Sequence, residues 1–230
     1  MSETNPRENP PLATAILQDV RTILTNPAGF YRRMPKAGGF GDPVTFVLVI
    51  AVVTAVAMAV FSLFGLGTVG EAMAVGFGGI IFLPIMALAL SFLGAGIVFV
   101  VWKIIGSQEP FEAAYRCMAY ASALYPISIV ASMIPYLGSI LGIAWWTYLM
   151  IVATTEVHRL PQKTAYVVFG ILGVFFITTN LSSEIVVRRM ASELENAGGN
   201  LQQLEKMQLD GVGNLGREPA TGLEKTLGEQ

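Results

Sequence analysis

"PVTFVLVIAVVTAVAMAVFSLFGLG", residues 43–67, runs for 25 residues without a charged side chain. A helix needs about 20 mainly apolar residues to cross the hydrocarbon core of a bilayer. The charge-poor region extends further, because Glu71 is the only charged residue between Val44 and Trp102. In the whole chain of 230 residues 13% are charged, whereas a soluble domain carries about 25%. This composition predicts an integral membrane protein.

Four more segments are long and apolar enough to be spans. They are residues 76–102, 113–134, 137–156 and 165–182. The connections between them are short, so we predict an all-α fold: a polytopic bundle of five transmembrane helices within residues 42–182. Pro84 lies inside the second segment and predicts a kink there, because proline removes a backbone donor and clashes with the preceding turn.

The two ends of the chain differ from this membrane domain. Residues 1–41 form an N-terminal arm, in which "LATAILQDVRTIL" (12–24) places Leu12, Ile16 and Val20 at helical spacing. This pattern predicts an amphipathic helix that lies on the membrane surface or caps the bundle. Residues 183–230 form a polar tail, which we predict to be helical to about Asn196 and disordered towards its end.

The basic residues predict the orientation in the membrane, because cytoplasmic connections are rich in Lys and Arg. Nine of them lie in the N-terminal arm, flank the connection after the second segment, or lie in the connection after the fourth: Arg7, Arg21, Arg32, Arg33, Lys36, Lys103, Arg116, Arg159 and Lys163. The two connections on the opposite side contain none. We therefore expect a cytoplasmic N-terminus and, after five spans, a C-terminus outside. Arg188 and Arg189 soon after the last segment are the observation against this orientation.

The stretch "QEPFEAAYRCMAYASALYP", residues 108–126, contains the first candidate site. Glu112 and Arg116 are one helical turn apart, in the favoured order for an ion pair. Two interpretations are open: the start of a helix at the cytoplasmic interface, or side chains (Glu112, Tyr115, Arg116 and Tyr120) that contact a lipid headgroup, an ion or a partner. His158, the only histidine, lies in a cytoplasmic connection and is added to this set.

Motifs of catalysis and cofactor binding are missing from the sequence. His158 has no nucleophile nearby in the sequence, and one histidine with one cysteine, Cys117, does not supply the three or four ligands that zinc needs. The basic residues are too few and scattered to form a nucleic-acid surface. We therefore expect no enzyme activity, no cofactor, no metal and no nucleic-acid partner.

Two stretches of the chain carry a resemblance to a known family. They are "NPAGFYRRMP" (26–35) and "GSQEPFEAAYRCMAYASALYPISIVASMIPYLGSILGIAWWTYLMIVATTEVHRLPQKTA" (106–165). The matching residues are Gly106, Phe111, Ala114, Tyr115, Arg116, Tyr120, Pro126, Pro135, Gly138, Trp145, His158 and Ala165. Over residues 26–182 the chain resembles the Yip (Ypt/Rab-interacting protein) domain family of five-span membrane proteins.

The resemblance implies a cytosolic N-terminus and five spans, as the charge pattern does independently. Eukaryotic members act in vesicle traffic and bind prenylated Rab-type GTPases or shape membranes. The arm of this chain is short and lacks their acidic-Leu-Tyr-Gly-Pro motif, so the resemblance does not extend GTPase binding to it. The chain is more similar to bacterial members, which implies the inner membrane.

Two functional hypotheses follow. The first is a non-enzymatic scaffold or membrane organiser, whose cytoplasmic face binds lipids or an unidentified membrane or cytoplasmic protein. The alternative is a small transporter or channel with a polar cavity near Glu112, Arg116 and Pro84. Small residues at four-residue spacing, such as Ala51, Ala55 and Ala59, favour helix packing within one chain and would also suit a homo-oligomer.

Overall fold

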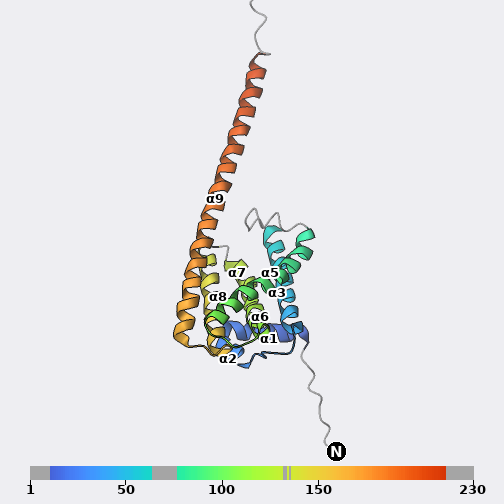
Figure 1. Cartoon of the computed structure of the whole chain (residues 1–230). Coiled ribbons are helices and arrows are strands. Elements are labelled where there is room, and N and C mark those ends of the chain that lie inside the picture. The colour runs from blue at the N-terminus through green and yellow to red at the C-terminus, as the bar shows by residue number, and fades with distance from the viewer. Residues whose placement is uncertain (1–10, 64–76, 132–133, 135, 216–230) are drawn as a thin grey trace, which may run out of the picture. The chain divides into compact units, whose positions relative to one another are not determined.

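The computed structural model describes residues 11–63, 77–131, 134 and 136–215. Within these ranges every regular element is helical and no strand occurs, which confirms the all-α prediction (Figure 1). In chain order the elements are α1 (Leu12–Thr25), α2 (Pro27–Arg33), α3 (Gly41–Leu63), α5 (Phe77–Ile104), α6 (Phe111–Ala121), the short 3-10 helix η1 (Ser122–Leu124), α7 (Tyr125–Ala131), α8 (Leu137–Glu156) and α9 (Gln162–Leu215).

Four helices are long and apolar enough to cross a membrane, over Gly41–Phe61, Phe82–Ile104, Leu137–Glu156 and Gln162–Leu194. Large apolar side chains point outwards from them: Val56 in α3, Leu93 in α5 and Val167 in α9 are 48%, 61% and 60% exposed. Extensive apolar surface of this kind indicates contact with lipid rather than with water. The prediction of a polytopic helical membrane protein is therefore confirmed, with four candidate spans.

The predicted third span, residues 113–134, is not a single helix, and the prediction is corrected here. Helices α6, η1 and α7 cover residues 111–131 and change from α to 3-10 geometry at Ser122–Leu124. Pro126 explains the break, because it has no N–H to donate to the carbonyl of Ser122 and its ring would clash with that carbonyl. The N–H of Tyr125 donates to the Ser122 carbonyl instead, which is the tighter 3-10 pattern.

Helix α6 lies in the interior of the bundle. It packs against α3, α5 and α8, and eight of its eleven residues are buried. Ala113, Ala114 and Ala119 are fully buried, and their small side chains let neighbouring helix backbones approach closely. The polar residues of α6 are therefore held inside the protein and not on its lipid-facing surface.

Helix α9 continues much further than expected. The sequence predicts a helical tail to about Asn196, whereas α9 is continuous to Leu215. Gly198 and Gly199 suggest a helix end, but glycine costs only about 1 kcal/mol relative to alanine in a helix, and no proline interrupts this stretch. The Leu, Gln, Glu and Lys residues that follow are strong helix formers. Residues 216–230, where we predict disorder, lie outside the described residues.

The chain divides into two compact units between Leu181 and Ser182. The first unit contains the polar contacts of the candidate site described below. Of the other expected spans, α8 coincides with the predicted 137–156 and α5 closely follows 76–102. The first span, predicted to reach residue 67, is helical to Leu63, and residues 64–76 lie outside the described ranges.

Candidate functional site

Residues 32–39, which we call the arm strap, comprise the end of α2 and most of its connection to α3, and they are tied to two distant connections. Arg32 donates two hydrogen bonds to the carboxylate of Glu156 at the end of α8, both of 2.9 Å. The ammonium of Lys36 donates to Glu109 Oε1 and to the carbonyl oxygen of Val157, each at 2.6 Å. The strap therefore joins the N-terminal arm to the chain before α6 and to the chain after α8.

Arg116 holds the other end of the strap. Its side chain is 1% exposed, and its Nη2 donates to the carbonyl oxygen of Gly39 at 2.6 Å. Its Nε donates to Glu112 Oε1 at 3.2 Å, and the N–H of Gly39 donates to the same oxygen at 2.7 Å. The carboxylate, the guanidinium and the backbone N–H and C=O of Gly39 thus form a closed ring of hydrogen bonds.

The glycines of the strap are required by this geometry. Gly39 has φ 86°, in the left-handed region that non-glycine residues rarely adopt. A Cβ at Gly38, which has φ 131°, would lie 3.3 Å from Arg116 Nη2. The sequence pair Gly38-Gly39 therefore permits the backbone to approach a buried guanidinium.

His158 lies in a second polar cluster, between the ends of α5 and α8. Its Nδ1 is 2.6 Å from the hydroxyl oxygen of Ser107, and its ring stacks on Trp102 at 3.9 Å between centroids. The indole N–H of Trp102 donates to Thr154 Oγ1 at 2.8 Å. His158 Nε2 is buried and has no hydrogen-bond partner among the residues that the structure describes. Burial lowers the pKa of His158 to about 4, although the nearby Glu109 carboxylate opposes this shift.

This lowered pKa predicts a pH dependence of stability. The unfolded chain takes up a proton at His158 near pH 6.5, whereas the folded chain does so only near pH 4. Stability is therefore highest above pH 6.5 and falls as the pH drops towards 4, by about 1–2 kcal/mol between pH 7 and pH 5. Unfolding free energies at the two pH values measure the effect, and His158→Gln should abolish it.

The single histidine also permits a direct titration. In protein carrying ¹⁵N-labelled histidine and an affinity tag without histidine, the ring nitrogens should report a neutral imidazole from pH 7 to pH 5. A folded-state pKa of 6 or higher would contradict the buried position of His158.

The structure separates the five residues predicted to form a site. Glu112 and Arg116 form the expected ion pair and hold the arm strap. Tyr115 is fully buried, stacks on Phe92 at 4.1 Å, and its hydroxyl lies 3.3 Å from Ser91 Oγ.

His158 belongs to the Trp102 cluster, whereas Tyr120 lines a pocket beside α1 and α2. The side chains of Tyr115, Arg116 and His158 are buried within the protein. Direct contact of these residues with a partner or lipid stays a prediction.

Sequence reasoning missed the residues that complete these clusters. Lys36 and Glu109 are 73 positions apart, and Arg32 and Glu156 are 124 apart, so no local spacing reveals these pairs. The one available signal was Gly38-Gly39 directly before an apolar segment, since paired glycines indicate an unusual backbone path.

No group of three or more His, Cys, Asp or Glu residues in the described part of the chain is arranged to hold a metal ion. Cys117 is fully buried in α6, where its carbonyl oxygen accepts a hydrogen bond of 3.2 Å from the Tyr31 hydroxyl. This contact anchors α2 on the bundle. The polar groups described above therefore serve to join helices and connections at one end of the molecule.

These features define a class: a polytopic helical membrane protein in which an N-terminal segment is bonded across one end of the bundle. The family model of the Yip1 domain matches residues 21–180, a range that contains every residue of the two clusters and the strap. The chain belongs to the Yip1 domain family. No curated protein and no solved structure matches the chain.

Proposed function

We propose that the chain crosses the membrane five times, with the N-terminus in the cytoplasm and the C-terminus outside, in a bacterial inner membrane. Four candidate spans support this topology, and residues 111–131 add a fifth, broken crossing of sufficient length. Ile127 and Val130 in α7 are 45% and 55% exposed, as expected beside lipid. The assignment to the inner membrane rests on the resemblance to bacterial members of the family.

In this proposal the chain has three parts: the arm at 1–41, the membrane domain at 42–182 and the tail at 183–230. Helix α1 acts as an amphipathic cap of the cytoplasmic end. Ile16 and Ile23 on one face are buried against the protein, and Leu12 and Leu17 are 60% and 68% exposed. The exposed leucines suit the headgroup boundary of the bilayer.

We further propose that the protein is a non-enzymatic scaffold, whose cytoplasmic face binds a partner protein or lipids. The observation that carries this proposal is the closed ring of Glu112, Arg116 and Gly39. In this ring the buried guanidinium and the half-buried carboxylate bond to each other and to the backbone, so they fix a surface instead of reacting with a substrate. Exposed side chains such as Gln108 and Arg159 lie on the two connections that the strap joins.

Photo-crosslinking in intact cells tests the scaffold. A photo-reactive residue at Gln108 or Arg159 is expected to give discrete protein adducts, because both positions are exposed at the proposed cytoplasmic end. The matched control is Val167, which is 60% exposed on an apolar span and should give lipid adducts. Lipid adducts alone at all three positions would contradict a protein-binding scaffold.

The alternative, a transporter or channel near Glu112, Arg116 and Pro84, stays a prediction. The guanidinium of Arg116 is bonded to Glu112 and to the strap, and Pro84 is buried within the continuous helix α5. These contacts favour a structural role for the three residues. A homo-oligomer likewise stays a prediction.

A further inference from the structure

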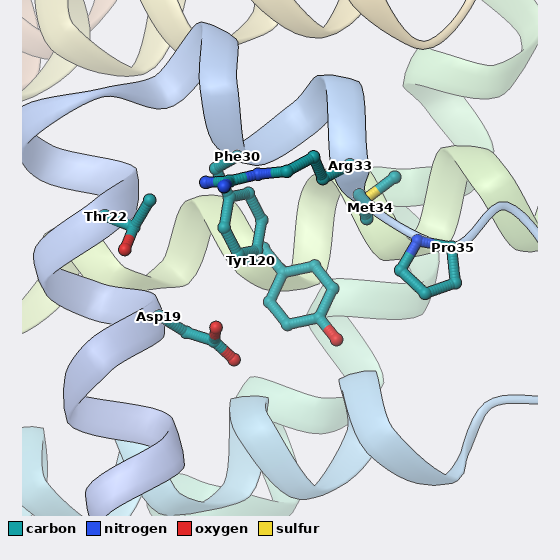
Figure 2. Close-up of a pocket in the computed structure, with 7 residues that line it drawn as sticks. All are labelled: Asp19, Thr22, Phe30, Arg33, Met34, Pro35 and Tyr120. Atoms are coloured by element: carbon teal, nitrogen blue, oxygen red, sulfur yellow. The ribbon is translucent and has the colours of Figure 1, made fainter.

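A pocket of about 270 Å³ lies between α1, α2 and α6 (Figure 2). It is lined by Asp19, Thr22, Phe30, Arg33, Met34, Pro35 and Tyr120. Figure 2 shows Tyr120 between the α1 side chains on one side and Met34 and Pro35 on the other. The aromatic ring of Phe30 packs edge-on against Tyr120, with 5.1 Å between the centroids. The pocket thus combines an aromatic wall with polar groups.

Two opposite charges line this pocket without pairing. The carboxylate of Asp19 has no ion pair or hydrogen bond to any residue that the structure describes, and burial raises the pKa of Asp19. Arg33 donates its Nε–H to the carbonyl oxygen of Gly29 at 3.0 Å, and no described residue accepts from its two Nη groups. An acid and a base that share a pocket but do not bond to each other suit a ligand that carries both charges.

The chemistry of the lining specifies that ligand further. A guanidinium binds phosphate oxygens in a planar, two-pronged geometry, and a carboxylate binds an ammonium group. The hydroxyls of Thr22 and Tyr120 also line the pocket. Thr22 donates its own proton to the carbonyl oxygen of Gln18 at 2.7 Å, so towards a ligand its oxygen can only accept. We propose that this pocket binds the phosphoethanolamine headgroup of a membrane lipid.

Size and position favour a lipid as the source of this headgroup. At about 270 Å³ the pocket is slightly smaller than the usual small-molecule site of about 300–1,000 Å³. It can therefore admit a headgroup and leaves the acyl chains outside. The exposed Leu12 and Leu17 of α1 provide apolar surface on the helix that forms one wall. This inference needs the bundle to lie in a membrane, but it does not depend on the scaffold role.

Calorimetric titration of the full chain in dodecyl maltoside tests the pocket. The four probes are dihexanoyl phosphatidylethanolamine, dihexanoyl phosphatidylglycerol, glycerophosphoethanolamine and inorganic phosphate. We expect the phosphatidylethanolamine to bind most tightly and the glycerophosphoethanolamine more weakly than the lipid. Equal affinity for the two lipids, or inorganic phosphate that displaces phosphatidylethanolamine at equal concentration, would overturn the proposal.

Two variants test separately the binding of the phosphate and the binding of the amine of the headgroup. Arg33→Gln should lower the affinity for both lipids about ten-fold, because both carry a phosphate. Asp19→Asn should lower the affinity for phosphatidylethanolamine alone, also about ten-fold, because phosphatidylglycerol has no amine. The matched controls Arg21→Gln and Asp42→Asn change exposed charges outside the pocket and should bind like the native chain. Native affinities in Arg33→Gln and Asp19→Asn, with the fold intact by circular dichroism, would also overturn the proposal.

Discussion

Replacement of Trp102 by alanine is expected to lower the free energy of unfolding by about 3–5 kcal/mol, the usual cost of removing a buried tryptophan. Trp102 is fully buried, stacks on His158 and donates to Thr154. Its ring also lies 5.9 Å from that of Phe169 in α9, so one side chain connects α5, α8 and α9. Thermal and denaturant unfolding in detergent, followed by near-ultraviolet circular dichroism, measures the loss.

Two variants bracket this effect. Trp102→Phe keeps an aromatic ring, although a smaller one, and removes the hydrogen bond to Thr154. The loss of that bond should cost about 1 kcal/mol, and the whole substitution should cost less than Trp102→Ala. Trp145→Ala removes a tryptophan that is 36% exposed and should cost less than Trp102→Ala. In Trp102→Ala, water reaches His158, and the pKa of that imidazole should rise towards 6.5. A native melting curve together with an unchanged His158 titration would exclude the stacked arrangement.

Arg116→Leu should destabilise the protein by about 3 kcal/mol, because it removes a buried guanidinium, 1% exposed, that is bonded to a carboxylate with 21% exposure and to a backbone carbonyl. The loss leaves Glu112 with a weaker set of partners and frees the carbonyl of Gly39. Limited proteolysis should then cut the arm strap, residues 32–39, at least several-fold faster than in the native chain. The double variant Glu112→Gln, Arg116→Leu should recover part of the stability, because no unpaired charge is left.

The chain offers a matched control for this variant. Arg188 forms the same i,i+4 arrangement with Glu184, but its side chain is 41% exposed. Arg188→Leu should therefore change stability by no more than about 0.5 kcal/mol. The contrary result is that Arg116→Leu lowers the stability as little as Arg188→Leu and leaves the strap as resistant to protease as in the native chain. That result would show that the ring of hydrogen bonds does not hold the strap.

The sequence predicted what depends on local composition and spacing. The apolar run of α8 identifies 137–156, and the order Glu112 then Arg116 identifies their ion pair. The prediction of helix boundaries failed where local signals compete. The apolar composition of 113–134 suggested one span, but Pro126 breaks it, and the glycines at 198–199 suggested a stop that the surrounding helix formers override.

The contacts that build the site could not be predicted from spacing. Lys36 reaches Glu109 and Val157, and Arg32 reaches Glu156, only because the bundle brings distant connections together. The burial of His158 has the same origin, since Trp102 and Ser107 cover it from another part of the chain. A lone histidine in a polar connection gives no local sign of such a cover.

The side of the membrane on which each connection lies tests the five-crossing account most directly. In a Cys117→Ala background, single cysteines replace Gln108 or Gln230. Cells with a permeabilised outer membrane and an intact inner membrane are then treated with a membrane-impermeant maleimide. The account predicts labelling of Gln230→Cys in intact cells and of Gln108→Cys only after the inner membrane is opened. Equal protection or equal labelling of the two positions in intact cells would contradict it.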